Sequence, residues 1–165
     1  MTSSELEFEQ FFLDNYDAVC TVLVLTTGDR ERAIDATQEA FIKAYAKWSK
    51  IRSYDSPAAW VRRVAINASR DTMRSEVRRR RREQATTAGD DSVHTDRYGS
   101  ESATHSLLDE LPPRQREAAM LYYVDDRSVT EIAQILKLNE GTVKYHLSQA
   151  RERLRDVMEH GGKPR

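Results

Sequence analysis

The sequence predicts an all-α protein in which two small helical domains are joined by a flexible linker, with a helix-turn-helix in the C-terminal domain. Glycine is scarce, with 6 in 165 residues, and the long stretches are rich in Ala, Leu, Glu, Arg and Gln, which favour helices. Apolar residues recur at helical spacing on both sides of a central segment, residues 84–106, that has almost no apolar periodicity. A chain of this length holds one ordinary domain or two small ones.

The first domain spans residues 1–83. Its apolar pattern between residues 8 and 48 predicts two helices, separated by a polar step in which Asp29 can cap the second helix. The β-branched patch at residues 19–25 has neither period-2 alternation nor a partner run, so we interpret it as helical rather than as a strand. A third helix is expected to begin near Pro57, since proline is favoured in a first turn, and to continue into a run of arginines.

The second domain spans residues 107–160 and is followed by a tail, residues 161–165. Its first helix is expected to open at Pro112 or Pro113. A polar turn then precedes a helix at residues 129–136, and a break leads to a last helix from about residue 142 to residue 158.

The last two helices have the spacing of a helix-turn-helix. Ala133 is small where two helix axes must approach, and Val143 and Leu147 are placed to hold the second helix against the first. Spacing alone is also compatible with an ordinary helical hairpin. The outward face of the second helix carries side chains able to reach base edges and phosphates in a major groove: Thr142, Lys144, Tyr145, Ser148, Gln149 and Arg151.

Charged residues are nearly balanced, with 26 Lys and Arg against 27 Asp and Glu, but they are segregated along the chain. Residues 60–82 hold nine arginines and two acidic residues, whereas residues 1–40 and 83–110 are strongly acidic. A basic block between two acidic ones is expected if one face of the protein meets a polyanion. The alternative is a solvated helix face followed by a basic tail.

Residue usage argues against an enzyme, a cofactor or a metal site. The four histidines are scattered without ligand spacing, and no Gly-rich phosphate loop is present, which disfavours a hydrolase built on Asp35 and Glu39. Cys20 lies among apolar residues and is expected to be a buried small hydrophobe rather than a nucleophile. The acidic start of the chain and the lack of a long apolar run predict a soluble, cytoplasmic protein.

A motif in the second predicted helix, Asp35-x-x-Gln38-Glu39-x-Phe41-x-Lys43, resembles the extracytoplasmic-function (ECF) type of RNA polymerase sigma factors, in the sigma-70 family. The resemblance covers nearly the whole chain outside the linker and tail. In that family this helix docks on the coiled-coil clamp of the polymerase's largest subunit. The resemblance implies a polymerase-binding face, most of it at the i, i+3, i+4, i+7 spacing of one helix face, made of Asp35, Gln38, Glu39, Ile42 and Lys43.

The second motif of the resemblance is Trp60, Val64-Ala65-Ile66-Asn67, Asp71 and Arg74, followed by the arginine run. In the family this helix and the preceding loop grip the promoter minus-ten element, and a flipped base enters a pocket beside the loop. Trp60 itself is expected to belong to the core, since it lies beside Val61 and Val64. The resemblance implies minus-ten contacts from Ile51, Arg52, Ser53, Tyr54, Asn67, Arg70 and Arg74.

The third motif comprises residues 111–117, Glu131-Ile132-Ala133, residues 141–144, and Ala150-Arg151-x-x-Leu154. It resembles the domain that reads the minus-thirty-five element. Tyr145, His146 and Gln149 stand where the family commonly has Ser, Arg and Arg, which implies a different promoter sequence or weaker phosphate binding.

The expected partners of such a protein are core RNA polymerase, promoter DNA and an anti-sigma factor, with no small-molecule substrate. The alternative function is a helix-turn-helix regulator that binds paired half-sites in duplex DNA as a dimer.

Overall fold

The computed structural model describes residues 1–86 and 107–161, and the helices in these ranges confirm the all-α class. No strand occurs within these two ranges, and the patch at residues 19–25 is helical. No helix in the described part of the chain is long and apolar enough to cross a membrane. Most of the predicted linker, from residue 87 to residue 106, and tail residues 162–165 lie outside the described residues.

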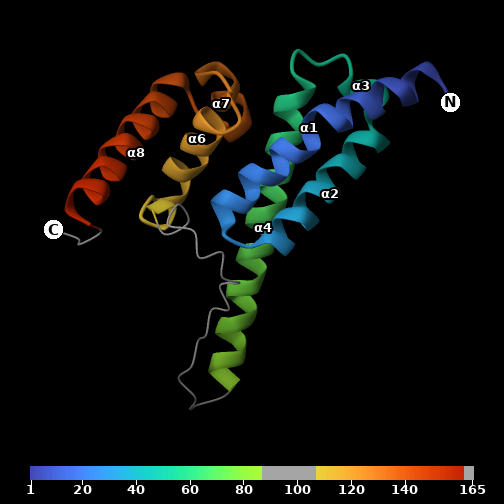
Figure 1. The fold of residues 1–165 in the computed structure, drawn as a ribbon. Helices are drawn as coiled ribbons and strands as arrows, with labels where there is room; N and C mark the ends of the chain where they lie inside the picture. The colour runs from blue at the N-terminus through green and yellow to red at the C-terminus, as the bar shows by residue number, and fades with distance from the viewer. Residues whose placement is uncertain (87–106, 162–165) are drawn as a thin grey trace.

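The N-terminal unit is a bundle of three long helices and one short helix (Figure 1). The expected cap at Asp29 is confirmed, since its side chain accepts a hydrogen bond from the Arg32 amide at 3.0 Å. Gly28 ends the first helix with φ 69°, a left-handed conformation that glycine adopts without steric cost. The helices are α1 (Ser3–Thr27), α2 (Arg30–Ala46), α3 (Trp48–Ile51) and α4 (Pro57–Thr86).

Aromatic side chains hold the end of this bundle where the loop after α3 begins. The ring centroid of Trp48 lies 4.9 Å from that of Phe11 and 5.3 Å from that of Phe8. Phe41 of α2 packs on Phe11 at 5.9 Å. Because these rings join α1, α2 and α3, they fix the starting point of the loop at residues 52–56.

Helix α4 is buried in its first half and exposed in its second. Val61, Ala65 and Ile66 lie in the core, whereas the arginine run at residues 78–82 is fully on the surface. The second half projects beyond the bundle (Figure 1), and an ion pair between Arg32 of α2 and Glu76 supports its base. The helix extends three residues past the expected end of the first domain at residue 83.

The C-terminal unit consists of α6 (Pro113–Tyr123), α7 (Val129–Leu136) and α8 (Glu140–His160), which agrees with the predicted helices. Pro113 opens α6 as expected. Between α7 and α8, Lys137 adopts φ 53°, and the Asn139 side chain accepts a hydrogen bond from the Thr142 amide at 2.7 Å. Ile132, Leu136, Val143 and Leu147 are buried between the helices, which confirms the helix-turn-helix.

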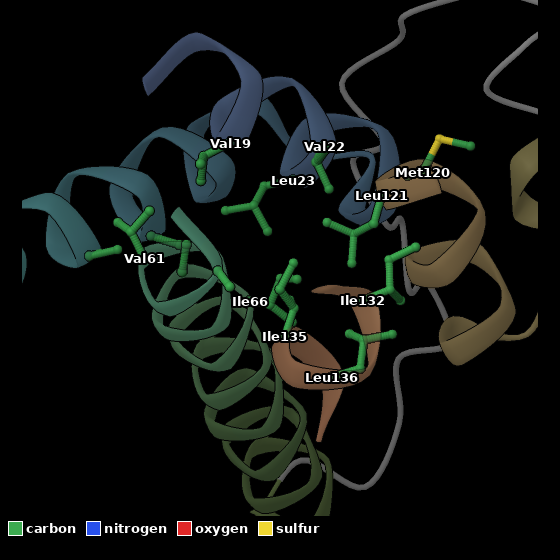
Figure 2. Packing of buried hydrophobic residues seen from close by; sticks show 14 of the residues in the cluster. Val19, Val22, Leu23, Val61, Ile66, Met120, Leu121, Ile132, Ile135 and Leu136 are labelled. Carbon is green, nitrogen blue, oxygen red and sulfur yellow. The ribbon is translucent and has the colours of Figure 1, made fainter. Parts of the chain in front are cut away.

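The two units share one buried cluster rather than forming separate cores. Figure 2 shows side chains from α1, α4, α6 and α7 that point into a common space, among them Leu23, Ile66, Leu121, Ile132 and Ile135. Helix α7 packs against α4, and α6 packs against α1. The region between residues 86 and 107 therefore connects two units that are already in direct contact.

Candidate functional surfaces

Helix α2 turns one charged face with an apolar centre toward solvent. Its opposite face is buried through small residues and Phe41. On the outward face, Ile42 is 69% exposed, and the neighbouring Tyr45 is 56% exposed. Together, Ile42 and Tyr45 form an exposed apolar centre among charged groups, which is the kind of surface that a partner helix can cover. The residues predicted to bind polymerase are all exposed: Asp35, Gln38, Glu39, Ile42 and Lys43.

Lys43 and Glu39 interact with each other on this face, with the Lys43 Nζ 2.7 Å from Glu39 Oε1. Both side chains are about half exposed, so the pair contributes little to folding stability. Within the described part of the chain, the side chains of Asp35 and Gln38 make no ion pair or hydrogen bond with another side chain of α2. Their polar groups face solvent and are accessible to a docking partner.

The loop between α3 and α4 borders a hollow of about 350 Å³. Tyr54 of the loop and Trp60 and Arg63 of α4 line it, together with Gln134 from α7. Trp60 is half-buried, so it packs against the core, as predicted, and also faces the hollow. An aromatic pair beside a guanidinium is suited to stacking on a base and holding its phosphate.

Two residues predicted to contact the minus-ten element have other roles in this structure. The Ile51 side chain is only 1% exposed, because it closes α3 and lies in the buried cluster with Trp48. This burial corrects the expectation that it faces DNA. Arg52 is exposed and pairs with Glu7 of α1, with Arg52 Nη2 2.6 Å from Glu7 Oε2, which ties the loop to the bundle.

The other predicted minus-ten residues lie on the surface, though not all are unengaged. Ser53 and Tyr54 are exposed on the loop, and Asn67 and Arg74 are exposed on α4. Arg63, Asn67, Arg70 and Arg74 follow the i, i+4, i+7, i+11 spacing of one helix face, which leads from the hollow toward the arginine run. Arg70 is bound by a carboxylate of the second unit, Glu117.

The recognition helix presents the predicted side chains on its outer face. Lys144, Tyr145, Ser148 and Arg151 are exposed, whereas Thr142 and Gln149 are half-buried. Arg151 Nη1 donates a hydrogen bond to the Tyr123 hydroxyl at 3.0 Å, and this bond raises the pKa of the guanidinium. Through this bond, Tyr123 of α6 holds the positively charged Arg151 side chain in place beside the outer face of α8.

Sequence reasoning missed the polar contacts between the two units. Arg62 Nε and Nη2 donate to both carboxylate oxygens of Asp125, and each of these side chains is 2% exposed. Arg116 Nη1 donates to the Thr26 carbonyl at 2.9 Å. The one sequence signal for Arg62 is its place on the apolar stripe of α4, four residues before the buried Ile66. Cys20, expected to be buried, is half-exposed.

A helix-turn-helix with an exposed polar recognition helix, packed on a helical unit that carries a basic helix, defines a two-domain DNA-binding protein. The Sigma-70 region 2 family matches residues 11–82, and the Sigma-70, region 4 family matches residues 102–154. The chain is 31% identical over 156 residues to RNA polymerase sigma-E factor from Streptomyces avermitilis, covering 93% of this chain and 86% of that protein. It is 30% identical over 173 residues to ECF RNA polymerase sigma factor SigM from Bacillus subtilis, covering 98% of each.

The chain therefore belongs to the ECF group of sigma-70 family RNA polymerase sigma factors. As a sigma factor, it directs promoter-specific transcription initiation by RNA polymerase.

Solved structures agree over both units. The sigma factor RpoE from Bartonella quintana, crystallised in complex with the anti-sigma factor NepR, has a TM-score of 0.77 and 25% identity, covering 93% of this chain and 97% of that chain. CnrH, in complex with the cytosolic domain of CnrY, shares the fold with a TM-score of 0.67 and 19% identity, covering 94% and 90%.

Proposed function

We propose that the outward face of α2 docks this sigma factor on the clamp coiled coil of the largest polymerase subunit. The observation that carries this assignment is the exposure of Ile42 at the centre of a charged face whose opposite side is buried. Asp35 and Gln38 supply hydrogen-bonding groups around that apolar centre. The match of residues 11–82 to the Sigma-70 region 2 family disfavours the alternative function, a regulator that binds DNA as a dimer. Such a regulator would not be expected to have both this match and this exposed face.

The proposed promoter contacts divide between the two units. On α8, Lys144 and Arg151 meet phosphates, while Gln149 and Ser148 read base edges of the minus-thirty-five duplex, with Thr142 and Tyr145 beside them. On the first unit, Tyr54 and the hollow beside Trp60 receive a base of the opened minus-ten strand, and Asn67, Arg70 and Arg74 hold the strand along α4.

A transcription experiment tests the function directly. Purified chain and sigma-free core polymerase are incubated with a fragmented bacterial genome, and the 5′ ends of the transcripts are sequenced. We expect starts that share two spaced upstream elements and that disappear without the chain. The variant Asp35→Ala with Gln38→Ala is expected to keep its helical content and lose most of these starts. Specific duplex binding without any specific starts would favour the dimeric regulator instead.

We further propose that an anti-sigma factor regulates this chain, because it is similar over nearly its full length to RpoE, which was crystallised in complex with an anti-sigma factor. A sigma factor works on the polymerase at the chromosome, which places the protein in the cytoplasm. We assign it no catalytic activity of its own, since its relatives are sigma factors and the chemistry belongs to the polymerase.

A further inference from the structure

The end of α6 carries an exposed pair of tyrosines beside the recognition helix. Tyr122 and Tyr123 are 38% and 50% exposed, and their ring centroids lie 4.9 Å apart at an interplanar angle of 81°. A tyrosine at the surface offers an apolar ring and a polar hydroxyl to a binding partner. None of the promoter contacts proposed above comes from α6.

The packing of α6 against α8 places the Tyr123 hydroxyl. The two helices lie side by side (Figure 1), and Ala119 of α6 and Ala150 of α8 are completely buried. Tyr123 lies one helical turn after Ala119, and Arg151 directly follows Ala150. The close packing of the helices therefore brings the Tyr123 hydroxyl to Arg151, whose Nη1 donates a hydrogen bond to it at 3.0 Å.

Arg151 is oriented without being neutralised. Within residues 1–86 and 107–161, no carboxylate forms an ion pair with Arg151, in contrast to Arg62 and Arg70. A hydroxyl fixes the direction of a guanidinium and leaves its charge available to an anion. The hydrogen bond to the Tyr123 hydroxyl also raises the pKa of Arg151, so the side chain stays protonated.

The two side chains have donors left for one further anion. A tyrosine hydroxyl that accepts a hydrogen bond still has its own proton to donate, and a guanidinium has five N–H donors, of which Tyr123 receives one. A backbone phosphate has two free oxygens. One oxygen can accept from the guanidinium and the other from the hydroxyl, and hydrogen bonds to charged phosphate are stronger than neutral ones.

The same place is continuous with the face of α8 assigned to duplex DNA. Lys144, Ser148 and Arg151 are all exposed and follow the i, i+4, i+7 spacing of one helix face. Tyr123 extends that face from α8 onto α6. Contacts to phosphates beside the bases that are read fix the position of a recognition helix on the duplex.

We propose that Tyr123 and Arg151 form a phosphate-binding site at the junction of α6 and α8, which takes one backbone phosphate flanking the minus-thirty-five element. Arg151 supplies the charge, and Tyr123 orients Arg151 and donates its hydroxyl proton to the same phosphate. The inference rests on the proposed function above, in which the outer face of α8 binds the minus-thirty-five duplex.

The first test measures promoter binding by the holoenzyme, assembled from the full chain and core polymerase, on a duplex taken from one of the mapped starts. Tyr123→Phe keeps the ring and removes the hydroxyl, and it should weaken filter binding roughly 3- to 10-fold. Arg151→Ala should also reduce the slope of log affinity against log salt by about 0.9. Tyr16→Phe removes a hydroxyl from α1 in the first unit and should bind like wild type.

The second test asks whether the two side chains act on one phosphate. Phosphates flanking the minus-thirty-five element are replaced, one at a time, by uncharged methylphosphonates. Wild-type holoenzyme should lose affinity at one position where Arg151→Ala loses none and Tyr123→Phe loses less. In the Arg151→Ala background, Tyr123→Phe should change affinity by less than about 2-fold, since the phosphate is no longer held against the hydroxyl. Equal sensitivity of all variants at every position, or losses that simply multiply, would overturn the shared site.

Lys144→Ala separates this inference from the proposed function. If Lys144→Ala weakens binding while Tyr123→Phe binds like wild type, the phosphate site is overturned and the recognition helix stands. If Lys144→Ala and Arg151→Ala both bind like wild type, the assignment of α8 to the duplex fails, and the phosphate site fails with it. The Tyr123–Arg151 bond is exposed, so the melting temperature should change little. Should Tyr123→Phe melt earlier, the methylphosphonate comparison still decides, because it compares duplexes on one variant.

Discussion

Replacing Ile42 by alanine is expected to weaken polymerase binding without affecting the fold. The side chain is 69% exposed in the free chain, so it contributes little to the core. Burying a whole isoleucine side chain is worth about 1.5–3 kcal/mol, and docking can cover at most the exposed two thirds. Two thirds of that range is about 1–2 kcal/mol, which is an upper limit because alanine keeps one methyl group, so the dissociation constant is expected to weaken by at most roughly 5- to 30-fold.

The assay is a titration of labelled chain with sigma-free core polymerase, followed by fluorescence anisotropy, with thermal unfolding measured in parallel. Leu13→Ala is the matched control, because Leu13 is a similarly large side chain on α1 and is 65% exposed. The melting temperature should change little for either variant. If Ile42→Ala binds like wild type, or if Leu13→Ala loses as much affinity, the docking face is not the outward side of α2.

The remaining predictions concern the recognition helix. Lys144→Ala should weaken promoter binding uniformly across sequences and reduce the slope of log affinity against log salt by about 1, measured by filter binding at several salt concentrations. Gln149→Ala should change base preference in a randomised minus-thirty-five library more than it changes overall affinity, and an unchanged preference would remove Gln149 from the reading face. Asn139→Ala removes the α8 cap and should lower the free energy of unfolding by about 1 kcal/mol in urea, whereas Asn139→Ser should restore most of it.

Features of the fold that depend on neighbouring residues could be predicted from the sequence. Asp29 follows a glycine and precedes an apolar period, and it caps α2. Pro113 begins α6, as expected for a proline, which is favoured in the first turn of a helix. The outward face of α2 could also be predicted from helical periodicity. The small residues of α2 recur on the side that packs against the bundle, so the charged residues on the opposite side face solvent.

The loop before α4 could be predicted less well, because its contacts depend on α1 and α3. Ile51 is adjacent to a polar segment, but the aromatic packing around Trp48 turns the end of α3 inward and buries it. Arg52 pairs with Glu7, which lies 45 positions earlier, and no local pattern indicates that pairing. Tyr54 and Asn67 stay exposed, as their predicted roles require.

The ion pairs of Arg62 with Asp125 and of Arg70 with Glu117 illustrate a limit of reading charge from sequence. Arginines in a basic block predict phosphate contacts, yet a guanidinium binds carboxylates and phosphates through the same planar pair of donors. Arg62 and Arg70 meet carboxylates that are 63 and 47 positions away, and sequence does not reveal which anion they contact. The same donors of Arg70 cannot bind Glu117 and a DNA strand together, so the contact with the minus-ten strand that we propose for Arg70 requires that Glu117 release it.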